Sequence, residues 1–284
     1  MHRASFLIGA AASAAAAGSI NDASAALAAL EKRSGGRLGV FAVDTGNGAA
    51  LAQRANERFP MCSTFKVLLV ATVLARVDRG AAHLNESIAY GRGDLLAYAP
   101  VTRASVARGS LTVGQLCSAA LVVSDNTAAN LLLAAVGGPP AVTRFTRGLG
   151  DALTRLDRTE PALNEALPGD PRDTTTPRAM VADWRALLQG AVLASSSRTF
   201  LNDGLTRCET GTARIRAGIP KGWQAGDKTG SGSRGTSNDV AVLRPPHRAP
   251  IYVAAYLTGA TVDADARDAT LASVGRIVAG TFAR

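Results

Sequence analysis

Lysine, histidine, cysteine and aromatic residues are all scarce in this chain of 284 residues. Aromatic residues make up 5% of the sequence, so there are few rings on which nucleic-acid bases could stack. Basic residues outnumber acidic residues by 31 to 22, but the arginines are scattered singly and form no basic tail. We therefore expect no nucleic-acid partner, although non-specific binding of polyanions stays open.

The few cysteines and histidines are too dispersed for the common metal and redox motifs. Cys62, Cys117 and Cys208 form no C-x-x-C pair, so the sequence offers no zinc knuckle and no thioredoxin-type site. His83 and His247 stand singly among polar or turn residues, which favours solvated side chains. We expect no metal and no cofactor, and a catalytic base other than histidine.

Long apolar runs are also missing: beyond the N-terminus, no stretch approaches 18 uninterrupted apolar residues, so no stable membrane insertion is expected. Residues 1–20 are different, because a basic residue precedes a short apolar stretch of small residues, which is typical of a secretory signal peptide. Several Ala-x-Ala sites put its cleavage between residues 15 and 25, and a retained N-terminal helix is the alternative. We expect an exported protein, periplasmic or secreted, that is a monomer.

The apolar periodicity indicates strands near both ends of the chain and a mainly helical middle, from residue 63 to 206. Both ends also contribute one helix each. Before the middle, we expect a helix at 25–32 and a strand at 37–43. After it, we expect two strands at 239–243 and 251–257 and a helix at 264–282. This order predicts one sheet built from both chain ends, with helices inserted between them.

The first motif that could carry chemistry is Ser63, three residues before Lys66 at the start of an apolar helical run. The i, i+3 spacing places the two side chains beside each other on one helix face. A serine nucleophile needs a neighbouring base, and a desolvated lysine can lose its proton whereas arginine cannot. For this motif alone, a helix cap followed by a surface lysine is an equally simple interpretation.

A second motif, Ser124-Asp125-Asn126, follows a helical stretch. Its hydroxyl, carboxylate and amide could relay a proton, support a loop and hold a substrate amide. A capping turn before the next helix explains the tripeptide equally well.

A third motif, Lys228-Thr229-Gly230, continues into Ser231 and reads as an edge strand. An ammonium and a hydroxyl on such a strand can bind a substrate carboxylate, and the small residues allow the substrate to lie alongside. A glycine-rich turn is the alternative.

A fourth motif places Glu160 four residues before Asn164 in a polar loop. Together a carboxylate and an amide could hold one water molecule, with Glu160 as its general base. The alternative is a solvated loop acid.

In their order and spacing, these four motifs resemble those of the class A serine β-lactamases. The resemblance covers nearly the whole chain after the signal segment. It implies an α/β plus all-α fold like that of serine β-lactamases and penicillin-binding proteins, with an antiparallel sheet from both chain ends, flanking helices and an inserted helical domain. The α/β domain would comprise residues 21–58 and 208–284, and the all-α domain residues 59–207.

The resemblance also implies hydrolysis of the β-lactam amide bond of penicillins and cephalosporins through a serine acyl-enzyme, and hence antibiotic resistance. Ser63 would be the nucleophile, and Lys66 and Glu160 would share the base work of acylation, with the choice between them open. Glu160 and Asn164 would activate the deacylating water, and Ser124 would protonate the departing lactam nitrogen.

Substrate binding is implied in the same way. The backbone N–H groups of Ser63 and Ser231 would bind the oxyanion. Tyr98 would wall the entrance, although a surface tyrosine is the alternative. The implied substrate-binding residues are Asn126, Asn164, Lys228, Thr229, Ser231, Tyr98 and Arg214.

The chain departs from the family pattern at several positions. Ser237 stands where many members carry an arginine that supports the carboxylate site. Arg214 matches the position from which other members supply a replacement guanidinium, and a surface arginine is the alternative. Cys62 would face Gly232, where carbapenem-hydrolysing members have its disulfide partner, so we expect three free cysteines. The family pattern further implies a salt bridge between Arg158 and Asp173 and allows a cis bond before Pro161.

Two relatives of this enzyme class remain as alternatives. A penicillin-binding transpeptidase or carboxypeptidase shares the serine, lysine and Lys-Thr-Gly plan but lacks the loop glutamate. A β-lactam sensor domain would stay acylated and would need a membrane tether.

Overall fold

A computed structural model describes the backbone of residues 5–283 and the side chains of residues 20–283. Of the predicted signal peptide, the backbone is described from residue 5, as the first part of a helix that continues to Ser34, and only one side chain, that of Ile20, is described. Within the described range, no helix combines the length and the apolar character needed to cross a membrane.

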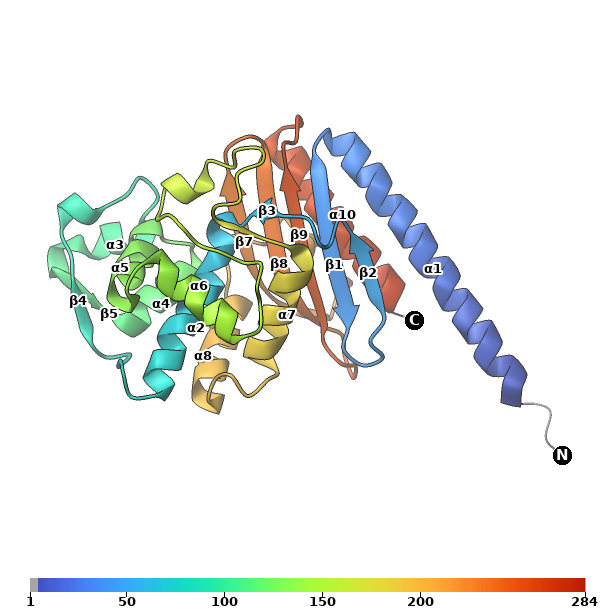
Figure 1. The fold of residues 1–284 in the computed structure, drawn as a ribbon, viewed down its shortest axis with the longest axis horizontal. Helices are drawn as coiled ribbons and strands as arrows, with labels where there is room; N and C mark the ends of the chain where they lie inside the picture. The colour runs from blue at the N-terminus through green and yellow to red at the C-terminus, as the bar shows by residue number, and fades with distance from the viewer. Residues whose placement is uncertain (1–4, 284) are drawn as a thin grey trace.

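A five-stranded antiparallel sheet, in the order β2-β1-β9-β8-β7, lies at one end of the molecule (Figure 1). Its strands come from both ends of the chain, which confirms the predicted sheet. Strand β9 pairs with β1 on one side and with β8 on the other. The strands are β1 (Arg37–Asp44), β2 (Ala50–Gln53), β7 (Gln224–Gly232), β8 (Thr236–Arg244) and β9 (Ile251–Thr258).

The two faces of the sheet contribute to two different hydrophobic cores. Along β1, Val40 and Ala42 belong to one core, and Phe41 and Val43 belong to the other. This alternation follows from the period of two in a strand. The first core is closed by α1 (Ser5–Ser34), α9 (Ile215–Gly218) and α10 (Ala264–Phe282).

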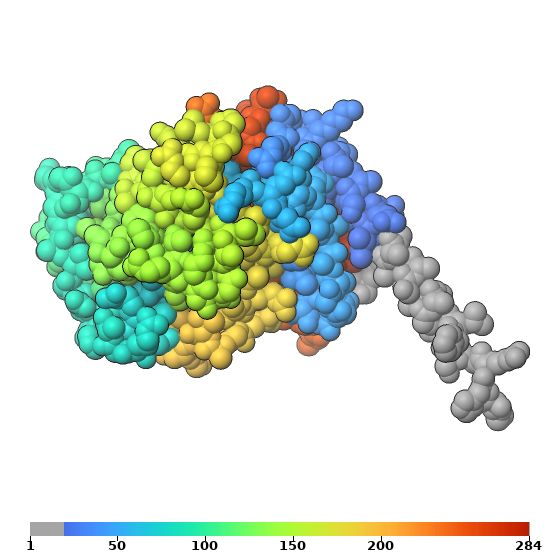
Figure 2. Space-filling view, in the orientation of Figure 1, coloured from blue at the N-terminus to red at the C-terminus, as the bar shows by residue number. Residues whose placement is uncertain are grey.

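The second core joins the sheet to the helical middle of the chain, and Figure 2 shows the two parts as one continuous body. Helix α2 (Phe65–Asp78) lies at its centre, and Phe65 to Ala75 are all buried. A helix that is apolar all round belongs inside a protein. Around it lie α4 (Val113–Val122), α5 (Asn126–Val136), α6 (Pro139–Gly148) and α8 (Ser195–Thr206). Helix α7 (Pro177–Leu188) packs against β1 and β9 of the sheet, and α3 (Pro100–Ser105) lies at the edge.

The helical middle also contains two strand pairs that the periodicity did not predict. One joins β3 (Phe59–Pro60) to β6 (Thr174–Thr175), and the other joins β4 (Ser87–Ala89) to β5 (Ser110–Thr112). Strands of two or three residues are too short to show an alternating pattern. The β3–β6 pair matters for the site, because it ties the segment before α2 to the end of the loop that carries Glu160.

Two buried carboxyl groups share one region of the second core. Burial and the neighbouring Asp151 raise the pKa of Asp183 to about 9. One carboxylate oxygen of each residue has no hydrogen-bond partner among the described residues. Burial therefore favours the neutral, protonated form of Asp183, which can donate a hydrogen bond to Asp151.

Asp183→Asn should stabilise the protein and flatten the dependence of its stability on pH. The folded pKa lies above the unfolded pKa, so the wild type loses stability as pH rises from about 4 to about 9. An amide keeps a donor towards Asp151 without titrating, and the expected gain at pH 7 is on the order of 3 kcal/mol. Urea unfolding at pH 5 and pH 8 measures the difference in the free energy of unfolding between the variant and the wild type. Asp203→Asn, at an exposed aspartate, is the control. Parallel pH profiles for wild type and Asp183→Asn would contradict it.

Candidate active site

Ser63 lies in a 3-10 turn, η1 (Cys62–Thr64), that leads directly into α2. Cys62 before it adopts a left-handed backbone conformation with φ of 45°, which turns the chain sharply at this point. The Ser63 hydroxyl donates a hydrogen bond to Glu160 Oε1 at 3.3 Å. Ser63 is partly exposed, so its hydroxyl stands at the boundary between the buried helix and the surface.

Lys66 is fully buried one turn further along the same helix. Its ammonium lies 3.1 Å from Glu160 Oε1 and donates to Asn126 Oδ1 at 2.6 Å and to the Ser124 carbonyl at 2.8 Å. Burial lowers the pKa of Lys66 to about 8, with Lys228 acting in the same direction and Glu160 against it. A lysine in this state can accept and release a proton close to neutral pH.

The Ser124 hydroxyl lies between two lysines. It accepts hydrogen bonds from Lys66 Nζ at 3.2 Å and from Lys228 Nζ at 3.0 Å. The next residue, Asp125, is buried, caps α5 through Ala128 N–H and accepts from Val101 N–H. Asp125 therefore acts both as the cap and as the loop support that the sequence suggested.

Glu160 is 3% exposed and is held from three directions. Its backbone N–H and carbonyl pair with the Asn130 side-chain amide at 2.9 and 2.8 Å. Its second carboxylate oxygen accepts from Asn164 Nδ2 at 2.5 Å. The Glu160–Pro161 bond is cis, as the family pattern allows. The sequence analysis missed Asn130, although its position four residues after Asn126, on one face of α5, was a usable signal.

The loop that carries Glu160 is closed at its neck by the expected salt bridge. Arg158 Nε lies 2.5 Å from Asp173 Oδ2, and Asp173 Oδ1 accepts from the backbone N–H groups of Asp157 and Arg158. Asp173 is buried, so this carboxylate serves as a fixed anchor for both ends of the loop.

Lys228 lies on β7, which is the edge strand that the sequence predicted. The side chain is fully buried, and burial lowers the pKa of Lys228. The adjacent Thr229 hydroxyl lies 2.6 Å from the Thr210 hydroxyl. Thr210 has no sequence motif that would mark it, because only the fold brings it to β7.

Arg214 is 8% exposed, which excludes the surface interpretation. Its guanidinium donates to Ser231 Oγ at 2.8 Å and to the Gly230 and Asn238 carbonyls at 2.9 and 2.8 Å. Asp268 pairs with its Nε at 2.8 Å. The guanidinium is thus fixed beside the end of β7.

These side chains surround one cavity of about 320 Å³. Lys66, Glu160 and Lys228 lie behind its wall, each 3% exposed or less. Tyr98 is 51% exposed and stands at the rim, where its backbone carbonyl accepts from Asn126 N–H at 3.1 Å. The cavity is lined by Ser63, Tyr98, Ser124, Asn126, Asn164, Thr210, Arg214, Thr229, Gly230 and Ser231.

Among the described residues, no group of three histidine, cysteine, aspartate or glutamate side chains is placed to hold a metal ion. The expectation of three free cysteines is confirmed, because each of them is buried and none forms a disulfide: Cys62, Cys117 and Cys208. A serine hydroxyl, a lysine of lowered pKa and a carboxylate in contact with both form the arrangement that nucleophilic catalysis requires.

Gly232→Ala should destabilise the protein, because the end of β7 is closely packed. A Cβ at this position would lie 2.7 Å from Cys62 Sγ and 2.8 Å from the Asn164 carbonyl. Overpacking of this kind costs about 1–3 kcal/mol. Thermal unfolding measures the loss. Gly93→Ala, whose Cβ would meet nothing within 4 Å, is the matched control. Equal melting temperatures for the two variants would refute the close packing at Gly232.

Comparison with known proteins gives concordant results. A sequence model of the β-lactamase enzyme family matches residues 22–282. β-Lactamase AST-1 of Nocardia asteroides is 51% identical over 251 residues, which cover 88% of this chain and 81% of that protein. β-Lactamase Toho-1 of Escherichia coli is 48% identical over 256 residues, covering 90% and 88%.

Solved structures agree with the sequence matches. An ancestral class A β-lactamase (GNCA) superposes with a TM-score of 0.90 at 59% identity, covering 92% of this chain and 100% of that chain. The class A β-lactamase PenP of Rhodopseudomonas palustris, titled as putative, gives a TM-score of 0.89 at 54% identity, covering 91% and 99%. A match over nearly the whole chain, in sequence and in fold, means that this chain belongs to the β-lactamase enzyme family, as a serine β-lactamase of class A.

Proposed function

We propose that this enzyme hydrolyses the amide bond of penicillins and cephalosporins through an acyl-enzyme on Ser63, and thereby confers resistance to them. One observation supports this assignment most strongly: Glu160 Oε1 contacts both the Ser63 hydroxyl, at 3.3 Å, and the Lys66 ammonium, at 3.1 Å. A nucleophile, a lysine able to titrate and a carboxylate thus share one point beside the cavity.

In the acylation step, Ser63 Oγ bonds to the lactam carbonyl carbon and the bond from that carbon to the lactam nitrogen breaks. The serine proton passes to Glu160, which accepts a hydrogen bond from the Ser63 hydroxyl, or to Lys66, which contacts the same carboxylate oxygen. Ser124 gives its proton to the departing nitrogen and is resupplied by the lysines that donate to its hydroxyl. The backbone N–H groups of Ser63 and Ser231 bind the oxyanion.

In the deacylation step, Glu160 takes a proton from a water molecule, whose oxygen attacks the ester carbon. The ester bond breaks, the proton returns to Ser63, and the opened acid leaves. Asn164 supports this step, because its Nδ2 donates to Glu160, while its Oδ1 is buried without a partner among the described residues. That oxygen can accept a hydrogen bond from the attacking water.

Substrate binding uses the remaining residues of the cavity. Asn126 binds the amide of the substrate side chain, and Tyr98 walls the entrance. Lys228, Thr229 and Ser231 face the substrate carboxylate, with Arg214 holding Ser231 Oγ at 2.8 Å. The carboxylate thus meets the ammonium and two hydroxyls of the edge strand β7, with the Arg214 guanidinium bound to Ser231.

The direct test is turnover of a chromogenic cephalosporin, followed by mass spectrometry of the rapidly quenched protein. Many turnovers, with an acyl adduct on the peptide that contains Ser63, are the expected result. A single stoichiometric burst would instead support a sensor or a peptidase. Absence of any reaction, or an adduct on another residue, would overturn the assignment.

Arg214→Ala should raise KM for β-lactams about tenfold, the size of one charge-assisted contact partly screened by solvent, with a smaller change in kcat. The guanidinium supports the carboxylate site and stands outside the bond-breaking steps. Arg214→Lys keeps the charge but loses the fork that reaches Ser231 and the two carbonyls, so partial rescue is expected. Steady-state kinetics on a penicillin measures both; a loss confined to kcat would count against the role.

We also propose the exported location and the organisation of the mature protein. Residues 1–20 would direct export to the periplasm or the medium and be removed, leaving a monomer without nucleic-acid partner or cofactor. The α/β domain would comprise residues 21–58 and 208–284, and the all-α domain residues 59–207. N-terminal sequencing of the exported protein and its sedimentation would test the first two points.

A further inference from the structure

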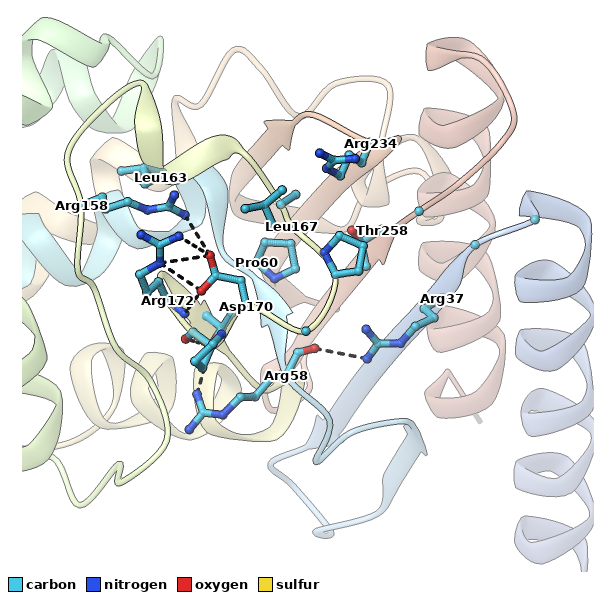
Figure 3. Close-up of a pocket in the computed structure, with 18 residues that line it drawn as sticks. Arg37, Arg58, Pro60, Arg158, Leu163, Leu167, Asp170, Arg172, Arg234 and Thr258 are labelled. Atoms are coloured by element: carbon cyan, nitrogen blue, oxygen red, sulfur yellow. Dashed lines mark hydrogen bonds and ion pairs between the residues drawn. The ribbon is translucent and has the colours of Figure 1, made fainter.

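A second cavity, of about 440 Å³, lies on the opposite side of the Glu160 loop and shares no lining residue with the active site (Figure 3). It is bounded by that loop, the turn between α1 and β1, the segment before β3, the β7–β8 turn and the end of β9. Its apolar lining includes Pro60, Leu163, Leu167, Pro168 and Pro171. Leu167 is 38% exposed and adds apolar surface to the cavity lining.

Arginines from four separate segments line the same cavity. Two of them belong to the loop and are neutralised there. Arg158 pairs with Asp173, and Arg172 pairs with Asp170 at 2.8 Å. These two pairs hold the loop together and leave little charge for a ligand.

The arginines on the other side of the cavity are less well neutralised. Arg37 pairs with the exposed Glu57 at 2.9 Å. Arg58 donates to the Leu153 carbonyl at 2.7 Å and to the Thr174 hydroxyl at 3.0 Å, both of which are neutral. Arg234 is exposed, and its side chain forms no hydrogen bond or ion pair within the described part of the chain. Positive charge therefore remains at the rim of an apolar cavity.

We propose that this cavity binds a small amphiphilic anion. A carboxylate or sulfonate head group would lie against Arg58 and Arg234, and an apolar body would lie on Leu167 and Pro60. The volume of about 440 Å³ lies in the range of small-molecule sites, so the proposed occupant is a small molecule. Charge supplies the orientation, and the apolar lining supplies the buried area.

The occupant would touch the loop that carries the catalytic carboxylate. Leu163 lines this cavity and the next residue, Asn164, lines the active site, so the two sites meet on opposite faces of one turn, η4 (Ala162–Asn164). A ligand that binds only the ordered loop stabilises it. Binding here is therefore linked to the placement of Asn164 and Glu160.

The probe for this site is 8-anilinonaphthalene-1-sulfonate, titrated into the whole enzyme and followed by its fluorescence. Arg234→Asn should weaken binding about fivefold, the effect of one exposed charge contact. Asparagine tolerates the left-handed conformation of residue 234, whose φ is 56°. Leu167→Ser should weaken binding to a similar extent. Arg276→Asn, an exposed arginine on α10, is the matched control and should bind as the wild type does.

Two further measurements separate this site from the active site and from simple apolar binding. Lys228→Ala should leave the affinity for the probe unchanged. If Lys228→Ala weakened probe binding and Arg234→Asn did not, the anion would lie in the active site and the proposal would be overturned. The uncharged N-phenyl-1-naphthylamine should bind at least about fivefold more weakly than the sulfonate. Equal affinity for the two probes would also overturn it. None of these readouts depends on catalysis.

Discussion

Glu160→Ala should convert this enzyme into one that is acylated by a β-lactam and stays acylated. Loss of a positioned general base lowers a rate by about 10²–10⁴-fold, and we expect deacylation to fall near the upper end of that range. The reason is that Glu160 is 3% exposed and that its carboxylate reaches Ser63, Lys66 and Asn164 at once. Among the described residues, no carboxylate lines the cavity itself, so no second acid is placed there to replace Glu160.

The measurement is intact-mass spectrometry during turnover of a penicillin, with the acyl adduct expected to persist for minutes. Glu160→Gln keeps the shape of the side chain and should behave in the same way, because an amide cannot accept the proton. Glu86→Ala, at an exposed glutamate in another loop, is the control and should turn over normally. Wild-type turnover by Glu160→Ala would remove Glu160 from the deacylation step.

Lys66→Arg should lower kcat/KM for acylation by about 10²–10⁴-fold although the positive charge is retained. Burial sets the pKa of Lys66 at about 8, so the lysine can exchange a proton near neutral pH, whereas a guanidinium stays charged. The larger head group must also fit where the ammonium now meets Asn126 and Ser124 at 2.6 and 2.8 Å. Lys32→Arg, an exposed lysine on α1, is the control.

The dependence of the wild-type rate on pH shows which group is the acylation base. If neutral Lys66 accepts the serine proton, kcat/KM rises as pH increases towards 8. If Glu160 accepts it beside a charged Lys66, kcat/KM falls above pH 8. Either profile should disappear in Lys66→Arg. A profile unchanged in that variant would show that Lys66 does not titrate during acylation.

Local spacing was enough to predict much of this molecule. The i, i+3 relation between Ser63 and Lys66 is a property of one helix, and the continuous apolar run of 251–257 is a property of one strand. The resemblance of four short motifs to a known family supplied the fold and the remaining residues. What these signals share is that each is carried by a few consecutive residues.

Other features depend on contacts between distant segments and left no local trace. Asn130 on α5 forms hydrogen bonds with the backbone of Glu160 in the loop. Thr210 reaches Thr229 only because α8 leads back towards β7. The raised pKa of Asp183 arises from burial beside Asp151, which a sequence does not display. The second cavity likewise draws its arginines from segments far apart in the chain.

The strand order has a consequence for how the protein is made. Strand β9 lies between β1 and β8, yet it is the last strand of the chain to be synthesised. Until residue 258 has emerged, β1 can pair only with β2, and the sheet cannot close. Contacts between such distant segments also form slowly. The five-stranded sheet is therefore complete only after nearly the whole chain has been synthesised, and the two chain ends meet in it as the last step.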